Sequence, residues 1–347
     1  MKVVIIGGGF CGATLAKELD NEKNMIVSLI DKNPFFEYNP SAHKCITQPG
    51  YQKNIRVNFN HFLKNTIIIN ESVQEVTPSS ILTDNRKIDF DYAVICTGCT
   101  YPIFLPKTEH VYTVPRSNEA KEVGKRLKED VKKVIIVGGG YIGTEIAAEL
   151  AKKRNDLEVL MVHAHDRLLE RGPTSASKHA KRFLQNNGVK FIFNEKIIDH
   201  PSEKKYITKG GKEIKADICI WCAGIAVDTS FIKDFRADIT DKTGRIKVNE
   251  SLQIMNYPQF FAGGDITNIL EEKTARKAEL HAHLIAENLK RIRDDKLLKQ
   301  YKKGKSPMIV SLGDNKGIGQ FGRFVISGFL AGYGKWLVEW WTLRQFL

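Results

Sequence analysis

The sequence contains nearly the same phrase twice, as "KVVIIGGGFCGATLAKEL" at residues 2–19 and "KVIIVGGGYIGTEIAAEL" at residues 133–150. Each copy has an apolar β-branched run, the pattern G-x-G-x-x-G, and a stretch rich in Ala, Leu and Glu. This order predicts a strand, a tight turn and a helix whose N-terminus faces the phosphates of a dinucleotide. The residues expected to line the two nucleotides are Gly7, Gly9, Phe10, Cys11 and Gly12 in the first copy, and Gly138, Gly140, Tyr141, Ile142 and Gly143 in the second.

A second apolar run follows each glycine motif at the distance that this fingerprint requires. The first, "IVSLID", ends in Asp31, 19 residues after Gly12, where a carboxylate accepts hydrogen bonds from ribose hydroxyls. The second, "LEVLMVHAHDR", has His163 where an acid usually stands, with His165 and Arg167 close by. Because an acid repels the 2′-phosphate of NADPH, its replacement by His163 predicts that NADH and NADPH both serve as donors.

Three further segments complete the pattern. "DYAVICTG" (91–98) and "ADICIWCAG" (216–224) are typical of strands that end in small-residue turns, which contain Thr97, Gly98 and Gly224. "QFFAGGDI" (259–266) places Asp265 before a helix, where a carboxylate can accept hydrogen bonds from the ribityl chain of a flavin. The sequence therefore predicts an α/β fold with two Rossmann-like dinucleotide-binding domains, the second inserted in the first, and a small C-terminal segment.

The chain has a net charge of +13, which permits binding to nucleic acid or to an anionic membrane as well as simple solubility. The apolar strand begins directly after Met1 and Lys2, which favours a cytoplasmic protein without a signal peptide. The six cysteines include two C-x-x-C pairs, each closing an apolar strand. Because residues i and i+3 of a strand point to opposite faces, we expect structural thiols and no metal site there.

Together these motifs resemble the flavoproteins with two dinucleotide-binding domains, and within them the type II NADH dehydrogenases and, more closely, the ferroptosis suppressor proteins. The closer likeness is carried by "VHAHDRLL", "SLGDNKGIGQ" (311–320) and "WWTLRQ" (340–345). The resemblance implies FAD at the first glycine motif, with Lys44 in place of the family's arginine and Val73 beside the adenine. It implies an FAD-binding domain at 1–107 and 229–305, an NAD(P)H-binding domain at 108–228, and a C-terminal membrane-interface or dimer segment at 306–347.

The resemblance also implies a quinone as electron acceptor, although Arg276 and Leu280 replace the glutamines of the quinone-side helix. Two residues are candidates for catalysis. His281, on that helix, is either a proton donor or a packing residue. Glu145 follows Gly143 and either positions the nicotinamide or complements the dipole of its helix.

Two other functions stay open. Cys45 is the candidate nucleophile of a single-cysteine disulfide or peroxide reductase, and this reading requires a lowered thiol pKa. A flavoprotein that binds nucleic acid, like the apoptosis-inducing factors, would use the positive charge. Nucleic acid is not expected, because the basic residues are spread along the chain without a recognition helix or zinc finger.

The C-terminal stretch "GKWLVEWWTLRQFL" has the spacing of an amphipathic helix, with Trp336, Trp340, Leu343 and Leu347 on one face. This face suits an anionic membrane surface or a homodimer interface, whereas the charges of Lys335 and Glu339 oppose a spanning helix. Upstream, "KRIRDDKLLKQYKKGK" (290–305) carries eight cations and two acids. The two segments together predict peripheral membrane attachment, which suits a lipid-soluble quinone.

Overall fold

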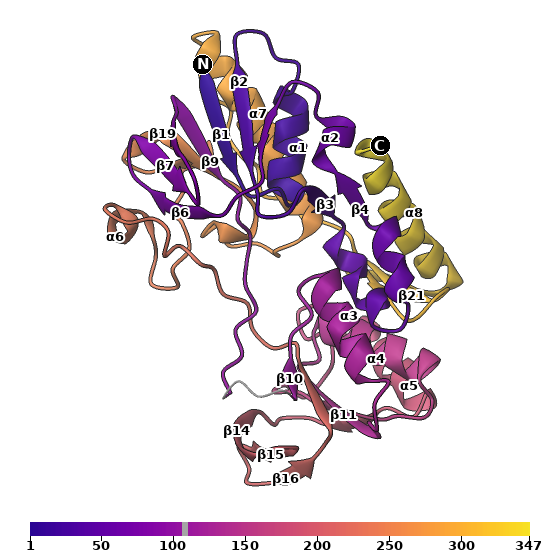
Figure 1. Ribbon diagram of the computed structural model, residues 1–347. Coiled ribbons are helices and arrows are strands. Elements are labelled where there is room, and N and C mark those ends of the chain that lie inside the picture. Colours follow the sequence, from indigo (N-terminus) through magenta and orange to yellow (C-terminus); the bar gives the residue numbers. More distant parts are fainter. Residues whose placement is uncertain (106–109) are drawn as a thin grey trace.

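The computed structural model describes residues 1–105 and 110–347, and its first sheet is built from two distant parts of the chain. The strand order is β18-β19-β9-β1-β2-β5, in which the β18–β19 pair is antiparallel and the other pairs are parallel. Figure 1 shows this sheet in the upper lobe. Its strands are β1 (Lys2–Ile6), β2 (Ile26–Ile30), β5 (Ile67–Ile69), β9 (Tyr92–Ile95), β18 (Gln253–Ile254) and β19 (Tyr257–Ala262).

The second sheet lies in the lower lobe and is entirely parallel, with the strand order β10-β17-β11-β12-β13. Three helices belong to this part of the chain, α3 (Ser117–Arg126), α4 (Tyr141–Lys153) and α5 (Thr174–Asn186). The strands are β10 (Val111–Tyr112), β11 (Lys133–Val137), β12 (Glu158–Val162), β13 (Lys190–Ile192) and β17 (Ile218–Trp221).

The chain leaves the first sheet after β9, builds the whole second sheet, and returns to the first sheet through β19. In that return, Phe260 and Phe261 of β19 pair with Ala93 and Val94 of β9. The predicted α/β fold with one dinucleotide-binding unit nested in the other is therefore confirmed. The expected boundary between residues 107 and 108 falls outside the described residues, and those after residues 228 and 305 stay predictions.

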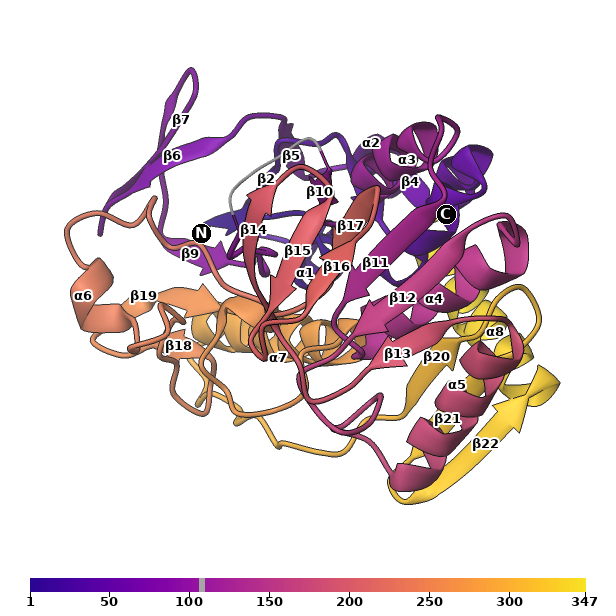
Figure 2. The same ribbon diagram turned by 90° about the horizontal axis from the view of Figure 1, so that it is seen from below.

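The central strands are buried on both faces, as the near-continuous apolar runs of parallel sheets require. In β1 and in β11 every residue after the first is buried. The helices α1 (Phe10–Leu19) and α7 (Ala275–Arg293) pack together on the first sheet, and Figure 2 shows α7 running beneath it. The strand–turn–helix order read from each glycine motif is thus present in both sheets.

Smaller elements cover the edges of the two lobes. Two short α-helices and three 3-10 helices are α2 (Phe59–Phe62), α6 (Arg236–Ile239), η1 (Asn39–Ile46), η2 (Pro49–Asn54) and η3 (Gly264–Ile266). The small antiparallel sheets are formed by β3 (Phe35–Glu37) with β4 (Arg56–Asn58), by β6 (Val73–Val76), β7 (Ser80–Thr83) and β8 (Lys87–Asp89), and by β14 (Ile197–Ser202), β15 (Lys205–Thr208) and β16 (Glu213–Lys215). In the second lobe, α3 and α4 both contact η1 of the first.

The C-terminal segment forms a three-stranded sheet and a long helix that touch both lobes. Its elements are β20 (Met308–Ser311), β21 (Gly317–Phe321), β22 (Phe324–Gly328) and α8 (Phe329–Gln345). The sheet packs on α4 and α5 of the second lobe. Beyond the end of α8, the ring of Phe346 lies 4.4 Å from that of Phe36 and 4.9 Å from that of Phe62, both in the first lobe.

We expect Phe346→Ala to lower the free energy of unfolding by about 3 kcal/mol, because it leaves a cavity among buried aromatic rings. The neighbouring Leu347 is 79% exposed, so Leu347→Ala is the matched control and should change stability by less than about 0.5 kcal/mol. Urea unfolding followed by fluorescence measures both. Equal effects of the two substitutions would contradict the docking of this end of the chain on the first lobe.

Candidate functional site

The three glycines of the first motif have three different surroundings. A Cβ atom on Gly7 would lie 2.6 Å from the carbonyl oxygen of Cys96, and one on Gly12 would lie 1.8 Å from that of Gly7. A Cβ on Gly9 would meet nothing within 4 Å. The first and third glycines therefore permit close backbone packing, whereas the second faces open space at the start of α1.

The second motif repeats this arrangement. A Cβ on Gly138 would lie 2.9 Å from the carbonyl oxygen of Cys222, and one on Gly143 would lie 2.0 Å from that of Gly138. Gly140, at the start of α4, faces open space like Gly9. Each motif thus forms a cradle that a side chain would fill, beside a helix N-terminus whose N–H groups attract phosphate. This geometry fits one dinucleotide at each motif.

Asp31 and His163 hold the two glycine turns in the same way. Gly8 N donates to Oδ2 of Asp31 at 2.7 Å, and Gly139 N donates to Nδ1 of His163 at 3.0 Å. Both side chains follow the second strand of their sheet, at the edge where ribose recognition takes place. The structure therefore places His163 at the position that the sequence comparison of the two motifs assigned to it.

Asp265 lies in η3, close to the turn that follows β9. Its Oδ2 lies 3.3 Å from Sγ of Cys99, and Arg245 donates to its backbone oxygen at 2.5 Å. Burial raises the pKa of the Asp265 carboxyl. In the same region Thr97 lies against Gly7, and Gly98 has a φ of +73°.

His281 is almost fully buried beneath this turn. Gly264 N donates to its Nδ1 at 3.0 Å, and its Nε2 lies 2.9 Å from Oε1 of Glu271. Burial lowers the pKa of His281 to about 4, so the ring is neutral near pH 7. Both ring nitrogens are engaged with protein atoms, which favours a role in positioning the Asp265 turn over proton donation.

Glu145 of α4 contacts the C-terminal helix α8. Its Oε1 accepts hydrogen bonds from Nζ of Lys335 at 3.0 Å and from the backbone N of Ser311 at 2.9 Å. Its Oε2 lies 3.8 Å from Nδ1 of His43. Burial would raise the pKa of Glu145, but the charge of Lys335 and the hydrogen bonds from Lys335 and Ser311, with His43 nearby, together hold this pKa below its usual value.

A second buried carboxylate, that of Glu339 on α8, contacts the first lobe. Ser41 and Tyr51 donate hydrogen bonds to it, and Nζ of Lys44 lies 3.2 Å from its Oε2. Lys44 also donates to the Tyr51 hydroxyl at 2.8 Å. The structure thus brings Lys44 to α8. Lys335, Ser41 and Tyr51 were missed as site residues by sequence reasoning, as was Glu339.

The remaining candidate residues lie at varied positions. Phe10 packs against Phe36 and Tyr38, and Sγ of Cys11 lies 3.2 Å from Sγ of Cys96. Val73 in β6 is half-buried, as are Tyr141 and Ile142 at the start of α4. Gly224 has a φ of +80° and faces the ring of Phe104.

Two expectations about the C-terminal region need correction. Leu343 is buried, and α8 turns Lys335, Glu339 and Leu343 inward at a spacing of four residues. The exposed apolar face is a different set: Phe329, Leu330, Tyr333, Trp336, Leu337, Val338, Trp340 and Trp341.

Many of the cations in the basic run at 290–305 are also paired with acids. Lys290 and Arg293 each lie 2.8 Å from a carboxylate oxygen of Glu22, and Lys299 lies 2.7 Å from Glu287. Five of the eight cations in the run therefore lie near acids, which are Glu22, Glu287 and, within the run, Asp294. The other three, Lys302, Lys303 and Lys305, are exposed and have no such neighbour among the described ion pairs.

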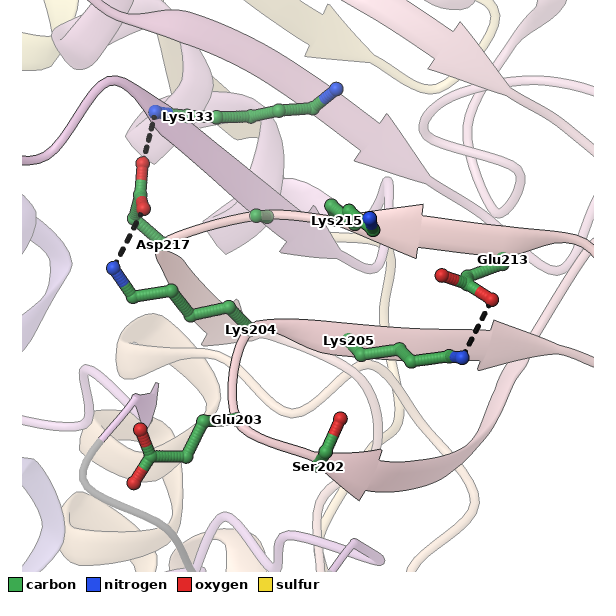
Figure 3. A pocket seen from close by; sticks show the side chains of 9 residues that line it. Lys133, Ser202, Glu203, Lys204, Lys205, Glu213, Lys215 and Asp217 are labelled. Atoms are coloured by element: carbon green, nitrogen blue, oxygen red, sulfur yellow. Dashed lines mark hydrogen bonds and ion pairs between the residues drawn. The ribbon is translucent and has the colours of Figure 1, made fainter.

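A surface hollow shown in Figure 3 does not belong to this site. It lies between the β15–β16 hairpin and the first residue of β11. Two of its lysines are paired with acids that also line it, Lys204 with Asp217 at 3.1 Å and Lys205 with Glu213 at 2.7 Å. Lys133 and Asp217 stand at the N-terminal ends of β11 and β17. Dinucleotides bind beyond the opposite, carboxyl ends of parallel strands.

Known proteins are similar to this chain in sequence and in fold. A model of the family described as "Pyridine nucleotide-disulphide oxidoreductase" matches residues 1–283. The chain belongs to the pyridine nucleotide-disulphide oxidoreductase family. As a member, it is a flavin-dependent NAD(P)H oxidoreductase, and its cofactors are FAD and NAD(P)H.

Relatives within the pyridine nucleotide-disulphide oxidoreductases match nearly the full chain. Apoptosis-inducing factor homolog A of Dictyostelium discoideum is 30% identical over 93% of this chain and 87% of its own length. Human ferroptosis suppressor protein 1 is 26% identical over 99% and 96%. The sulfide:quinone oxidoreductase of Aquifex aeolicus shares the fold with a TM-score of 0.87 at 20% identity, over 99% of this chain and 91% of its own. An NDH2 of Plasmodium falciparum in complex with NADH has a TM-score of 0.85 at 15% identity, over 99% and 94%.

The open positions at Gly9 and Gly140 generate a paired prediction. Both have extended backbone angles that valine adopts readily, so Gly9→Val and Gly140→Val should fold. We expect Gly9→Val to be purified without FAD, and Gly140→Val to keep FAD but to weaken NADH binding at least tenfold. Flavin absorbance and titration with NAD⁺ measure the two effects, and each variant is the control for the other. FAD loss from Gly140→Val, with retention in Gly9→Val, would reverse the assignment of the two cradles.

Proposed function

We propose that this oxidoreductase passes electrons from NAD(P)H to a quinone, and that it does so at the surface of an anionic membrane. The observation that carries the proposal is α8, which contacts the second glycine helix through Lys335 and Glu145 and exposes a broad apolar face on its other side. The helix thereby links the nicotinamide side of the protein to a surface suited to lipid. The likeness to ferroptosis suppressor proteins and to a sulfide:quinone oxidoreductase supports the choice of acceptor.

In this proposal the first glycine cradle holds the pyrophosphate of FAD and Asp31 holds its adenosine ribose. When bound, FAD supplies the hydride acceptor for the nicotinamide and a two-electron donor for the quinone. Asp265 accepts hydrogen bonds from the ribityl chain, and His281 fixes the turn that carries it. The other residues proposed to contact the two nucleotides are Phe10, Cys11, Lys44, Val73, Thr97, Gly98, Tyr141, Ile142, His163 and Gly224.

Glu145 is proposed to position the nicotinamide end of the donor. Its carboxylate lies one turn into α4 from the second glycine cradle and is 6% exposed. Lys335 keeps it ionised, so it presents an acceptor for a hydrogen-bond donor such as the carboxamide of a nicotinamide. His43, whose pKa burial lowers to about 4, stays neutral beside it.

The Cys45 alternative loses support from the structure. Cys45 is fully buried, and burial raises the pKa of its thiol to about 11. A disulfide or peroxide reductase needs a thiolate at neutral pH, and at this pKa only about one thiol in ten thousand is ionised at pH 7. The paired cations of the basic run likewise weaken the reading as a nucleic-acid-binding flavoprotein.

Membrane contact is proposed through the exposed apolar face of α8. Within residues 1–105 and 110–347, no helix combines the length and the apolar character needed to cross a bilayer. Tryptophan and tyrosine rings favour the membrane interface, and cations border this face: Arg344 stacks on Trp340 at 4.9 Å, and Lys316 lies 5.7 Å from the Phe329 ring. Exposed rings with flanking cations are typical of peripheral binding to anionic lipid.

For the acceptor, we expect the enzyme reduced anaerobically with NADH to be reoxidised rapidly by a short-chain quinone. Cys45→Ser should leave this rate within about twofold, because a buried un-ionised thiol takes no part. Stopped-flow absorbance of the flavin measures both. Slow reoxidation by quinone with fast reoxidation by a disulfide, abolished in Cys45→Ser, would replace the quinone proposal.

For the membrane, we expect the triple substitution of Leu330, Trp336 and Trp341 by serine to reduce binding to anionic liposomes at least tenfold. The buried side of α8 is untouched, so FAD content and ferricyanide reduction should be unchanged. Leu270, 90% exposed outside this helix, provides the control Leu270→Ser. If the triple variant binds liposomes normally but changes from dimer to monomer in sedimentation, the face is a subunit interface instead.

A further inference from the structure

In the second glycine-motif unit, His163 stands after β12 where an acid is usual. It carries no negative charge itself, but an acid lies close to it. Nδ1 of His163 accepts the hydrogen bond from Gly139 N, which leaves the proton of a neutral ring on Nε2. Oε2 of Glu170 lies 3.3 Å from that Nε2. In the first fingerprint a single residue, Asp31, provides both the acceptor for the turn and the charge. In the second, these two roles are divided between His163 and Glu170.

The two contacting atoms, Nε2 of His163 and Oε2 of Glu170, are both buried. Among the described residues, neither Nε2 of His163 nor Oε2 of Glu170 has a well-aligned hydrogen-bond partner, so the contact is mainly electrostatic. The Glu170 side chain as a whole is 26% exposed. The contact with His163 lowers the pKa of Glu170 to about 2, so the carboxylate is charged throughout the physiological range. A permanent negative charge thus stands at the rim of the second nucleotide cradle.

The turn that carries Glu170 is built to hold it there. Leu169 has a φ of +49°, a left-handed conformation that is unfavourable for leucine, and its N–H donates to the carbonyl oxygen of Gly139 at 2.9 Å. The guanidinium of Arg167 donates to the carbonyl oxygens of Glu170 at 2.6 Å and of Gly172 at 3.1 Å. The turn is therefore fastened to the same glycine loop that His163 supports.

We infer that Glu170, held in place by His163 and by the turn at 167–172, selects NADH over NADPH. The inference rests on the proposed placement of the nicotinamide nucleotide at the second glycine motif. At that motif the residue following the second strand faces the 2′ position of the adenosine ribose. A carboxylate beside it tolerates a hydroxyl there and repels a dianionic 2′-phosphate.

Both guanidinium groups of this turn already have partners in the protein. Arg167, which the sequence suggested as a partner for the phosphate, has its guanidinium bonded to backbone carbonyl oxygens. Arg171 forms an ion pair with Glu272 at 3.7 Å. The inference therefore differs from the expectation from sequence, in which both nucleotides serve about equally.

The test compares NADH and NADPH in two measurements that need no quinone. One is the anaerobic rate of flavin reduction at sub-saturating nucleotide. The other is the equilibrium affinity for ADP-ribose and for its 2′-phosphate, measured by calorimetry. We expect the wild-type protein to favour NADH and ADP-ribose by more than tenfold. Glu170→Gln, which keeps the size of the side chain, should reduce both ratios about tenfold, mainly by improving binding of the phosphorylated ligand.

Asp166→Asn is the matched control, because Asp166 is an exposed acid of the same segment and the substitution removes the same charge. It should leave both ratios within about twofold. An unchanged ratio in Glu170→Gln, an equal effect of Asp166→Asn, or a wild-type protein without preference would each overturn the inference. Absence of quinone turnover would contradict the proposed acceptor alone, whereas binding of neither ADP-ribose ligand would overturn the placement of the nucleotide.

Discussion

The ion pair between Lys335 of α8 and Glu145 of α4 is the contact on which the arrangement of the site depends. Removing one partner of such a buried pair commonly costs about 3–5 kcal/mol, because the other charge is left without compensation. The carboxylate also accepts the N–H of Ser311, so a single side chain joins the glycine helix, the C-terminal sheet and the C-terminal helix. The helix that begins at the second nucleotide cradle is therefore fastened to the end of the chain.

The same interaction explains why α8 is amphipathic in the reverse of the usual sense. A surface helix of a globular protein normally turns its apolar side inward. Here Lys335 and Glu339 face the protein, where Glu145, Lys44, Ser41 and Tyr51 satisfy them, and the tryptophans face outward. Burial of two opposite charges is acceptable because each has hydrogen-bond partners on a different lobe. The apolar side is thereby free for a ligand or a lipid surface.

Much of the fold could be predicted from the sequence, because the information is local. Gly7, Gly9 and Gly12 lie within six residues of one another, and their different surroundings follow from the strand–turn–helix geometry of that short segment. Asp31 could be located by counting from the last glycine, since the helix between them has a standard length. The nested order of the two units followed from the same motifs together with the Gly-Gly-Asp turn at Asp265.

The features of the site that could not be predicted from the sequence depend on contacts between distant segments. Lys335 and Glu339 were visible as charges in a tryptophan-rich stretch, but their inward orientation depends on Glu145 and Lys44, 190 and 295 residues away along the chain. Glu170 was not singled out, because its contact with His163 requires the left-handed turn at Leu169. Helical spacing alone cannot tell which side of α8 meets the protein, and here the charged side does.

The position of α8 also limits how the molecule can move. Two-domain oxidoreductases can bring their nucleotides together by rotating one domain against the other about a hinge. In this protein one rigid helix is anchored at Lys335 to the second lobe, and Phe346, eleven residues later, is packed among rings of the first. Rotation would have to break a buried ion pair or open an aromatic cluster. The helix therefore acts as a strut that holds the two glycine cradles at a fixed separation and orientation.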